Sequence, residues 1–412
     1  MDYFSYKNNK LYCEDVDLQE IAKECGTPCY VYSKKTLERH VEVYKNAFKT
    51  KDNLICFSVK SLSNISILEL INKKGCGFDV VSGGELRRAL HVGADPKKII
   101  FSGVGKSYEE ILLGVQNDIL SFNIESEAEV YRIEEIASSQ NKIVDVGIRF
   151  NPEVDSGGHE YIKTGRKGDK FGISSNDSLL KIADYIYQSK NLNLVGLACH
   201  IGSQILDLES YRLTAKNIKE LSINIKKIGH KLNFLDLGGG LGIPYENDKT
   251  PSPEELISII EEELIDIDEM IVLEPGRSIS GNAGILLTTV EYIKDNFLIA
   301  DAAMNDLLRP ALYKAKHDVW NLKETKTIDQ IWTIVGPVCE SSDVIAKEHR
   351  INADVGDVLA IKTAGAYGFV MSSNYNSRMR PAEVLVDDET FNIIRSRESF
   401  DDLIKNEMNL ND

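Results

Sequence analysis

The chain has 412 residues, 42% of them hydrophobic, and a formal net charge of −16. This length allows a large buried core and predicts two domains, or one barrel with an added module. The acidic balance argues against nucleic acid or an anionic membrane as a partner, and no apolar run of about 18 residues predicts a membrane span. We therefore expect a soluble cytoplasmic protein whose basic site residues are placed for an anionic ligand.

The seven cysteines lack the spacing of a disulfide framework. Cys25 and Cys29 are close in the chain, but no second pair follows to complete a zinc site, so no metal is expected. Most of the cysteines are expected to be reduced, buried thiols of a cytosolic protein. The N-terminal MDYFSYKNNKLYCED has no apolar core of signal-peptide length.

The first 33 residues predict short strands. In YFSYKNNKLYCE, Asn8 and Asn9 predict a turn between two of them. We expect residues 1–33 to join a β domain that the C-terminal part of the chain forms.

Residues 34–280 predict a closed (β/α)₈ barrel of the TIM type. Short β-rich runs alternate there with amphipathic stretches, and the runs lie at 54–59, 77–82, 99–103, 121–126, 144–150, 194–202, 234–239 and 270–276. Strands alternating with helices predict a parallel sheet, and eight such units predict a barrel. A Rossmann sheet is the alternative, but it has fewer strands, and GGGLG at 238–242 lacks the GxGxxG spacing.

Residues 281–412 predict an antiparallel β domain. Runs at 285–293, 296–302, 330–338 and 357–363 read as strands separated by turns rather than helices. The last segment, 387–412, reads as an acidic helical tail.

Residues with chemical potential fall at the C-terminal ends of barrel strands, where barrel enzymes place their sites. Lys60 ends an apolar run, and desolvation would make its amine nucleophilic, suited to a Schiff base with an aldehyde. A surface lysine is the commoner reading of that position alone. His200 could stack on an aromatic cofactor and Ser203 could donate to its phosphate, although a single histidine is more often structural.

The motifs LDLGGG and EPGR add a phosphate cradle and a buried charge pair. Gly238, Gly239 and Gly240 would let backbone N–H groups approach a phosphate, or would form a flexible turn. Glu274 could bond a pyridine nitrogen and keep it protonated, and Arg277 could hold a phosphate or carboxylate. An ion pair in a Pro-Gly turn is the alternative.

The predicted β domain carries a second group of candidates. Cys339 could donate a proton and Glu340 could accept a substrate ammonium, although a cysteine alone is more often an inert buried thiol. Arg309 and Tyr313 suit a substrate carboxylate, and the alternative is a helix start with a solvated arginine. Tyr367 lies in a glycine-rich segment and is expected to be exposed where a ligand can approach, unless that segment is a plain turn.

Taken in this order, FSVKSLSN (57–64), FDVVSGGEL (78–86), CHIGSQ (199–204), LDLGGGLGIPY (235–245) and EPGR (274–277) resemble the barrel motifs of fold-type III, alanine-racemase-like, pyridoxal phosphate (PLP) decarboxylases. DAAMNDLLRPALY (301–313), GPVCESSD (336–343) and SSNYNSRMRPAEVL (372–385) resemble the more specific β-domain motifs of the diaminopimelate decarboxylase family.

The resemblance implies a role for each candidate. Lys60 would carry PLP as a Schiff base, His200 would stack on its ring, Glu274 would pair with the pyridine nitrogen and Cys339 would donate the proton. The remaining cofactor-binding residues would be Ser203, Gly238, Gly239, Gly240, Pro275, Gly276, Arg277 and Tyr367. The substrate-binding residues would be Arg277, Arg309, Tyr313, Glu340 and Tyr367.

The resemblance also implies the reaction and the assembly. It implies decarboxylation of meso-2,6-diaminoheptanedioate to L-lysine and CO₂, the last step of lysine biosynthesis, in a homodimer with shared active sites. One rival is a decarboxylase for ornithine or arginine, but those substrates would leave an arginine for a distal carboxylate unpaired. The other rival is a non-catalytic PLP-binding homologue, which would be expected to have lost Lys60 or Cys339.

Overall fold

The computed structural model describes residues 2–154, 170–245, 249–325 and 329–410. The contacts within the chain divide it into two compact units. The barrel unit comprises residues 40–243 and 249–278, and the β unit comprises residues 1–39, 244–248 and 279–412.

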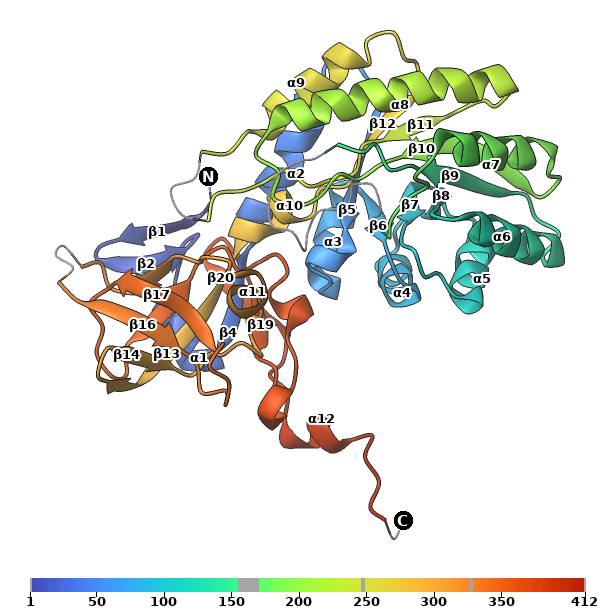
Figure 1. The fold of residues 1–412 in the computed structure, drawn as a ribbon. Helices are drawn as coiled ribbons and strands as arrows, with labels where there is room; N and C mark the ends of the chain where they lie inside the picture. The colour runs from blue at the N-terminus through green and yellow to red at the C-terminus, as the bar shows by residue number, and fades with distance from the viewer. Residues whose placement is uncertain (1, 155–169, 246–248, 326–328, 411–412) are drawn as a thin grey trace. The chain divides into compact units, whose positions relative to one another are not determined.

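Eight parallel strands close into a barrel in the barrel unit, which confirms the predicted barrel. They are β5 (Asn53–Ser58), β6 (Gly77–Val80), β7 (Ile99–Phe101), β8 (Ser121–Ile124), β9 (Val144–Arg149), β10 (Leu192–Ala198), β11 (Phe234–Asp236) and β12 (Met270–Leu273). The strands follow one another in chain order, and β12 pairs with β5 to close the ring. Each of the eight predicted runs contains one of these strands or overlaps it, and Figure 1 shows them inside a layer of helices.

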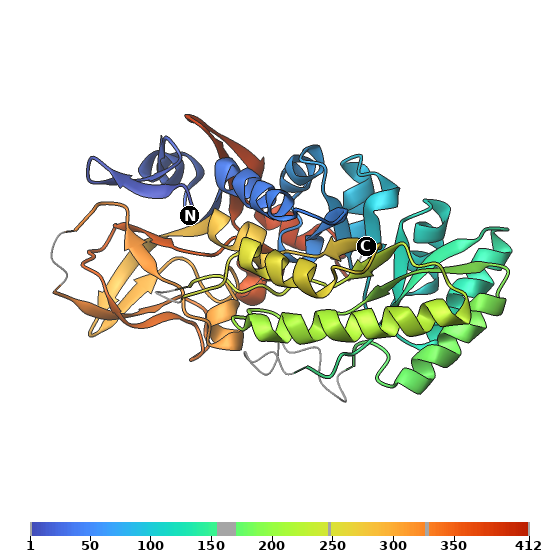
Figure 2. The same ribbon diagram turned by 90° about the horizontal axis from the view of Figure 1, so that it is seen from above.

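Helices alternate with the barrel strands along the chain. The helices are α2 (Lys34–Ala47), α3 (Ile65–Lys73), α4 (Gly83–His91), α5 (Tyr108–Gln116), α6 (Glu127–Ser139), α7 (Asn176–Gln188), α8 (Leu208–Ile228), α9 (Pro253–Glu263) and α10 (Arg277–Ser280). Those from α3 to α9 each begin at a polar N-cap whose side chain accepts a backbone N–H. Ser107 and Glu110 form a capping box that fixes the start of α5. The longest helix, α8, buries Ile218 and Ile225 and runs along one side of the barrel unit in Figure 2.

The barrel interior changes from apolar to polar along the strands. Phe78, Phe101, Phe122 and Phe234 have no solvent exposure and fill the core of the barrel unit. Polar residues follow at the C-terminal ends of the strands. Since burying charges without partners is costly, their arrangement there marks the functional end of the barrel.

The β unit contains a nine-stranded sheet and a separate three-stranded sheet. The large sheet contains β4 (Cys29–Ser33), β13 (Gly284–Lys294), β14 (Phe297–Ala300), β15 (Val319–Asn321), β16 (Ile331–Val335), β17 (Val344–Arg350), β18 (Val358–Ile361), β19 (Ala382–Asp387) and β20 (Thr390–Arg395). Its helices are α1 (Leu18–Cys25), α11 (Arg309–Tyr313) and α12 (Phe400–Ile404). The N-terminal strand β4 lies between β13 and β19, as the predicted joining of the N-terminal strands requires.

The large sheet is mixed rather than wholly antiparallel. The β4–β19 and β14–β16 pairs are parallel, and the remaining pairs are antiparallel. A parallel pair needs a long crossover, and both pairs have one, because β4 comes from the opposite end of the chain and α11 and β15 intervene between β14 and β16. The turn residues in the sequence therefore predicted where the strands of this sheet begin and end, but not which strands run parallel.

The N-terminal residues form their own sheet from β1 (Phe4–Lys7), β2 (Lys10–Cys13) and β3 (Val16–Asp17). Asn8 and Asn9 join β1 to β2 with φ of 50° and 63°, the left-handed conformation that a tight hairpin needs. Leu11 and Val16 pack in one hydrophobic cluster with Leu287 of β13, so this sheet shares the core of the β unit.

The predicted helical tail was wrong over its first part. Residues 390–395 form the strand β20, which pairs with β19 across a turn where Asp388 has a φ of 56°. The alternation of apolar and polar residues in TFNIIR and its two adjacent isoleucines favour this strand. Helix α12 is confined to Phe400–Ile404, and residues 411–412 of the predicted tail lie outside the described residues.

Candidate active site

A cavity of about 250 Å³ opens at the C-terminal ends of the barrel strands. It brings together three of the predicted residues, Lys60, His200 and Glu274. Its other lining residues are Val81, Ser102, Gly103, Asn123, Arg149, Phe171, Ala198, Cys199 and Asp236. The barrel therefore places an amine, an imidazole and a carboxyl group around one space.

Lys60 lies one turn beyond β5 and forms an ion pair with a buried aspartate. Its Nζ lies 2.6 Å from Oδ2 of Asp79, a residue of β6 without solvent exposure. Ser58 Oγ donates to the same oxygen at 2.8 Å. The amine is thus held at the cavity wall beside a group that can accept its proton.

Glu274 and Asp236 form a pair of buried carboxyl groups on neighbouring strands. Burial, followed by the nearby charges of Asp236 and Asp79, raises the pKa of Glu274 well above its ordinary value. Burial raises the pKa of Asp236 to about 6, against an opposing hydrogen bond from the backbone N–H of Gly238. Two such carboxyl groups in hydrogen-bonding contact hold a proton between them.

One carboxyl oxygen of Glu274, Oε1, is buried without a hydrogen-bond donor among the described residues. Leaving a buried acceptor unsatisfied costs about 1–3 kcal/mol, so such an atom marks a position where a ligand donor is expected.

The glycine segment after β11 is tightly enclosed. Gly240 has a φ of 101°, and a Cβ there would collide with the carbonyl oxygen of Gly202. A Cβ on Gly239 would collide with the carbonyl oxygen of Glu274. Gly239 N–H donates to Nδ1 of His200 at 3.2 Å, which fixes the imidazole against the segment. Only glycine fits this segment, so the segment is tightly packed rather than a flexible turn.

The surroundings keep His200 uncharged. Burial first, and then the positive charges of Arg149 and Lys60, lower the pKa of His200 well below its ordinary value. A neutral imidazole presents a flat face to the cavity without adding a charge.

The EPGR turn follows β12 and returns to the end of β5. Pro275 accepts a hydrogen bond from the backbone N–H of Ser58 at 3.2 Å, and a Cβ on Gly276 would come within 2.9 Å of Ser61 Oγ. Arg277 is buried, and its Nη2 donates to Ser203 Oγ at 3.0 Å. This arginine–serine contact brings two predicted phosphate residues together.

In the β unit, the loop after β16 carries Cys339 and Glu340. Cys339 is exposed, unlike the other six cysteines of the chain, five of which are buried. The reading of Cys339 as a buried thiol was therefore wrong, because the residue lies in the loop between β16 and β17 and is open to solvent. Its backbone N–H donates to Asn376 Oδ1 at 3.1 Å, and Tyr375 OH donates to Oε1 of Glu340 at 2.7 Å.

Arg309 begins α11 and is buried at 5% exposure. Its guanidinium lies 4.6 Å from the ring centroid of Tyr245, and its Nη1 lies 3.0 Å from Nε2 of His317. The reading of Arg309 as a solvated arginine was therefore wrong. Tyr313, the last residue of the same helix, is half-buried.

Tyr367 has a φ of 56°, a conformation that costs energy for a residue other than glycine. It is half-buried rather than exposed as expected, because the segment that carries it packs closely. A Cβ on the adjacent Gly368 would come within 2.8 Å of the Tyr30 ring. Such strained positions cluster at functional sites.

Sequence reasoning missed Asp79, Asp236 and Arg149, which line or support the cavity. Each is an ionisable residue inside an apolar barrel strand, and this pattern was the available signal. Arg149 pairs with Glu125 at 2.7 Å, and Glu125 also accepts from the backbone N–H of Gly103. The pair therefore fixes the cavity wall from behind.

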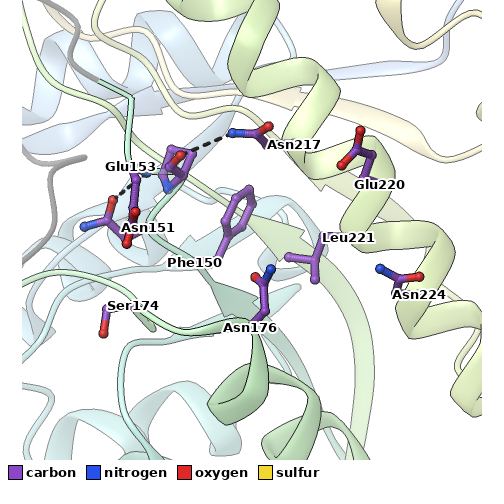
Figure 3. A pocket seen from close by; sticks show the side chains of 10 residues that line it. Phe150, Asn151, Glu153, Ser174, Asn176, Asn217, Glu220, Leu221 and Asn224 are labelled. Carbon is purple, nitrogen blue, oxygen red and sulfur yellow. Dashed lines mark hydrogen bonds between the residues drawn. The ribbon is translucent and has the colours of Figure 1, made fainter.

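A second cavity, of about 380 Å³, lies on the same unit and is polar (Figure 3). It is lined by Phe150, Asn151, Pro152, Glu153, Ser174, Asn176, Asn217, Glu220, Leu221 and Asn224. Asn217 Nδ2 donates to the Pro152 carbonyl at 3.2 Å across its wall. These lining residues include no predicted site residue.

Two further findings concern the described residues as a whole. None of their helices is both long enough and apolar enough to cross a membrane. Their histidine, cysteine and acidic side chains form no group of three or more that could hold a metal ion.

Comparison with known proteins agrees with this geometry. A family model described as "pyridoxal-dependent decarboxylase, pyridoxal binding domain" matches residues 34–281. Diaminopimelate decarboxylase of Haemophilus influenzae is 45% identical to this chain over 98% of both sequences. That of Aquifex aeolicus is 42% identical over 98% of this chain and 97% of its own length.

Solved structures show the same likeness. Diaminopimelate decarboxylase of Helicobacter pylori, complexed with L-lysine, matches with a TM-score of 0.92 and 40% identity over 94% of this chain and 98% of its own. The enzyme of M. jannaschii, in co-complex with L-lysine, matches with a TM-score of 0.94 and 35% identity over 99% of this chain and 98% of its own.

Proposed function

This chain belongs to the diaminopimelate decarboxylase family, and from that membership we propose that it decarboxylates meso-2,6-diaminoheptanedioate to L-lysine and CO₂ with PLP as cofactor. The observation that carries the proposal is the buried Oε1 of Glu274, which lacks a donor among the described residues and lies in one cavity with Lys60. A pyridinium N–H is a donor that such an atom would accept.

The residues present fit PLP. Glu274 offers the unsatisfied acceptor for its ring nitrogen, Lys60 offers an amine for its aldehyde, and neutral His200 offers a flat face for its ring. Arg277 and Ser203 offer donors for its phosphate beside the enclosed segment of Gly238, Gly239 and Gly240. The N–H groups of Gly238 and Gly239 already bond Asp236 and His200, so these two glycines would contribute close approach rather than donors. Pro275, Gly276 and Tyr367 complete the proposed cofactor-binding set.

When bound, PLP supplies a protonated ring that draws electrons from the bond between Cα and the carboxylate of the substrate. Asp79 Oδ2, at 2.6 Å, is placed to take the proton that Lys60 gives up when its amine becomes a nucleophile. Glu274 keeps the ring nitrogen protonated and opposes its charge. Cys339 then delivers a proton to Cα.

The substrate differs from ornithine and arginine in its distal carboxylate. We propose that buried Arg309 binds this group, with Tyr313, Arg277 and Tyr367 contributing to the substrate pocket. Glu340 would bind the distal ammonium. Ornithine and arginine have no distal carboxylate for Arg309 to bind, which favours the diacid over these two alternatives.

The proposed activity is tested with purified protein and PLP, given the diacid, ornithine and arginine in separate assays. We expect CO₂ and lysine in equal amounts from the diacid and far less product from the other two. CO₂ from ornithine or arginine instead would identify the rival decarboxylase, and bound PLP without any CO₂ would identify a non-catalytic homologue.

Replacing Arg309 tests the substrate assignment. Arg309→Ala should cost about 2–5 kcal/mol in binding of the diacid, because it removes one partner of a buried charge pair. KM is the measurement, and the matched ligand is D-lysine, which has the carboxylate of the reacting end of the meso diacid and lacks the distal one. Its inhibition constant should change much less. Arg309→Lys keeps the positive charge but lacks the planar pair of N–H groups. Its KM for the diacid should therefore lie between those of wild type and Arg309→Ala. Equal losses for both ligands would mean that Arg309 is structural.

We also propose a homodimer in which the loop with Cys339 and Glu340 completes the site of the neighbouring chain. Chains with Lys60→Ala and chains with Cys339→Ala should each be nearly inactive. After dissociation and mixing, half of the dimers are heterodimers, and each has one intact site. Activity should recover to about a quarter of wild type, from two-fold symmetry. Heterodimers that form without recovery would show that each site is built within one chain.

A cytoplasmic location is part of this proposal. Its support is the biosynthetic family to which the chain belongs and the seven free thiols of the structure, which suit a reducing compartment.

A further inference from the structure

Arg309 is held by two aromatic side chains of the β unit, neither of which the sequence analysis assigned to the site. Its guanidinium lies over the Tyr245 ring at 4.6 Å, and its Nη1 lies 3.0 Å from His317 Nε2. The Tyr245 and His317 rings meet edge to face, with centroids 5.3 Å apart. The arginine therefore has a ring against its face and a nitrogen at its edge.

The hydrogen bonds of His317 define its tautomer. Nδ1 lies 2.8 Å from the carbonyl oxygen of Lys362, which only accepts, so Nδ1 carries the hydrogen. A guanidinium only donates, so Nε2 must present its lone pair to Arg309. A neutral His317 satisfies both contacts at once, and it adds no charge beside the arginine.

The backbone keeps His317 in this position. Lys314 has a φ of 52° after α11, and this turn brings the chain back beside Arg309. The Lys362 N–H then donates to the carbonyl of Asp318 at 2.8 Å, while its carbonyl accepts from His317. Because β15 is paired with β18 at this point, the imidazole is fixed to the sheet and is 3% exposed.

We propose that His317 is a positioning residue which, with Tyr245, holds the Arg309 guanidinium in one orientation for the distal carboxylate of the diacid; the inference rests on the proposed function. A guanidinium recognises a carboxylate through a planar pair of N–H groups, so its orientation sets the strength of binding. His317 accepts one N–H at the edge and Tyr245 covers one face. These two contacts set the direction in which the guanidinium faces the substrate.

Three variants distinguish the role of His317 Nε2, which contacts Arg309, from that of Nδ1, which contacts the Lys362 carbonyl. His317→Gln places an acceptor where Nε2 lies, and His317→Met has the same length with only a weak acceptor. His317→Asn keeps a donor for the Lys362 carbonyl but has no atom that reaches Arg309. Each variant is assayed for kcat and KM with the diacid and for inhibition by D-lysine, and its thermal unfolding is recorded.

We expect His317→Met and His317→Asn to raise KM for the diacid about tenfold to a hundredfold, the loss of one hydrogen bond to a charged group. In both variants kcat and the inhibition constant of D-lysine, which lacks the distal carboxylate, should stay within about threefold of wild type. His317→Gln should restore most of the affinity. Adding His317→Met to Arg309→Ala should raise KM no further, because the two residues act through one contact.

The control is His349→Gln, a histidine of the same unit whose ring bonds the Val319 carbonyl at 2.8 Å instead. Its KM should equal that of wild type. If the Gln and Met variants have the same KM, or if KM for the diacid and inhibition by D-lysine change together, His317 is structural and the inference is overturned. A wild-type protein that releases no CO₂ from the diacid would instead overturn the proposed function itself, and the inference with it.

Discussion

Lys60→Ala and Lys60→Arg should each abolish decarboxylation, lowering kcat on the order of 10⁴-fold or more, as expected when a covalent nucleophile is removed. The two variants differ in what they leave behind. Alanine leaves Asp79, which has no solvent exposure, without the cation 2.6 Å away, whereas arginine keeps a positive charge near it. Since removing one partner of a buried pair destabilises a fold, Lys60→Arg should be the more stable variant.

Labelling checks the assignment independently of activity. Borohydride reduction of the wild-type protein with PLP, followed by peptide mapping, should place the pyridoxyl group on Lys60. Neither Lys60 variant should be labelled there. Lys142→Ala is a suitable control, because Lys142 pairs with Asp118 at an exposed position and should leave labelling and activity unchanged. A label on any other lysine of the wild-type protein would refute the assignment.

The barrel could be predicted because the apolar runs, the helix caps and the regular alternation of strands and helices all indicate the same fold. The strands are apolar runs, such as LICFSV, that are buried on both faces, and the helices from α3 to α9 begin at polar caps such as Ser107 or Asp207. The C-terminal ends of parallel strands meet at one rim, so Lys60, His200 and Glu274 could be placed together before any coordinates.

Three features needed the structure. Asp79 and Asp236 stand inside apolar strands, and nothing local shows that one pairs with Lys60 and the other with Glu274. His317 lies outside every predicted motif, and only the left-handed turn at Lys314 brings it to Arg309. Strand direction in the β unit depends on crossovers between distant segments, which no short pattern encodes.

Glu274→Gln should keep PLP bound and lower kcat by about 10²–10³-fold, the range for losing one preorganised electrostatic group. The amide has nearly the shape of the carboxyl group but no negative charge to hold the ring nitrogen protonated, so the electron sink weakens. KM should change much less than kcat, because the charge matters most when electrons reach the ring. Asp236 is present in both proteins, so a difference in kcat between them reports the loss of the Glu274 charge alone.

The pH dependence of folding supplies the control for this variant. Burial raises the pKa of Glu274 well above its ordinary value of 4.5, so above that pH the folded cofactor-free chain binds more protons than the unfolded chain. Its free energy of unfolding should therefore fall as pH rises from about 4.5 toward the folded pKa. Glu274→Gln removes this group from the titration, so its loss of stability over that pH range should be smaller than in wild type. Thermal unfolding at pH 5 and pH 8 measures the difference. An unchanged kcat, or identical pH dependences, would mean that Glu274 does not carry the buried charge assigned to it.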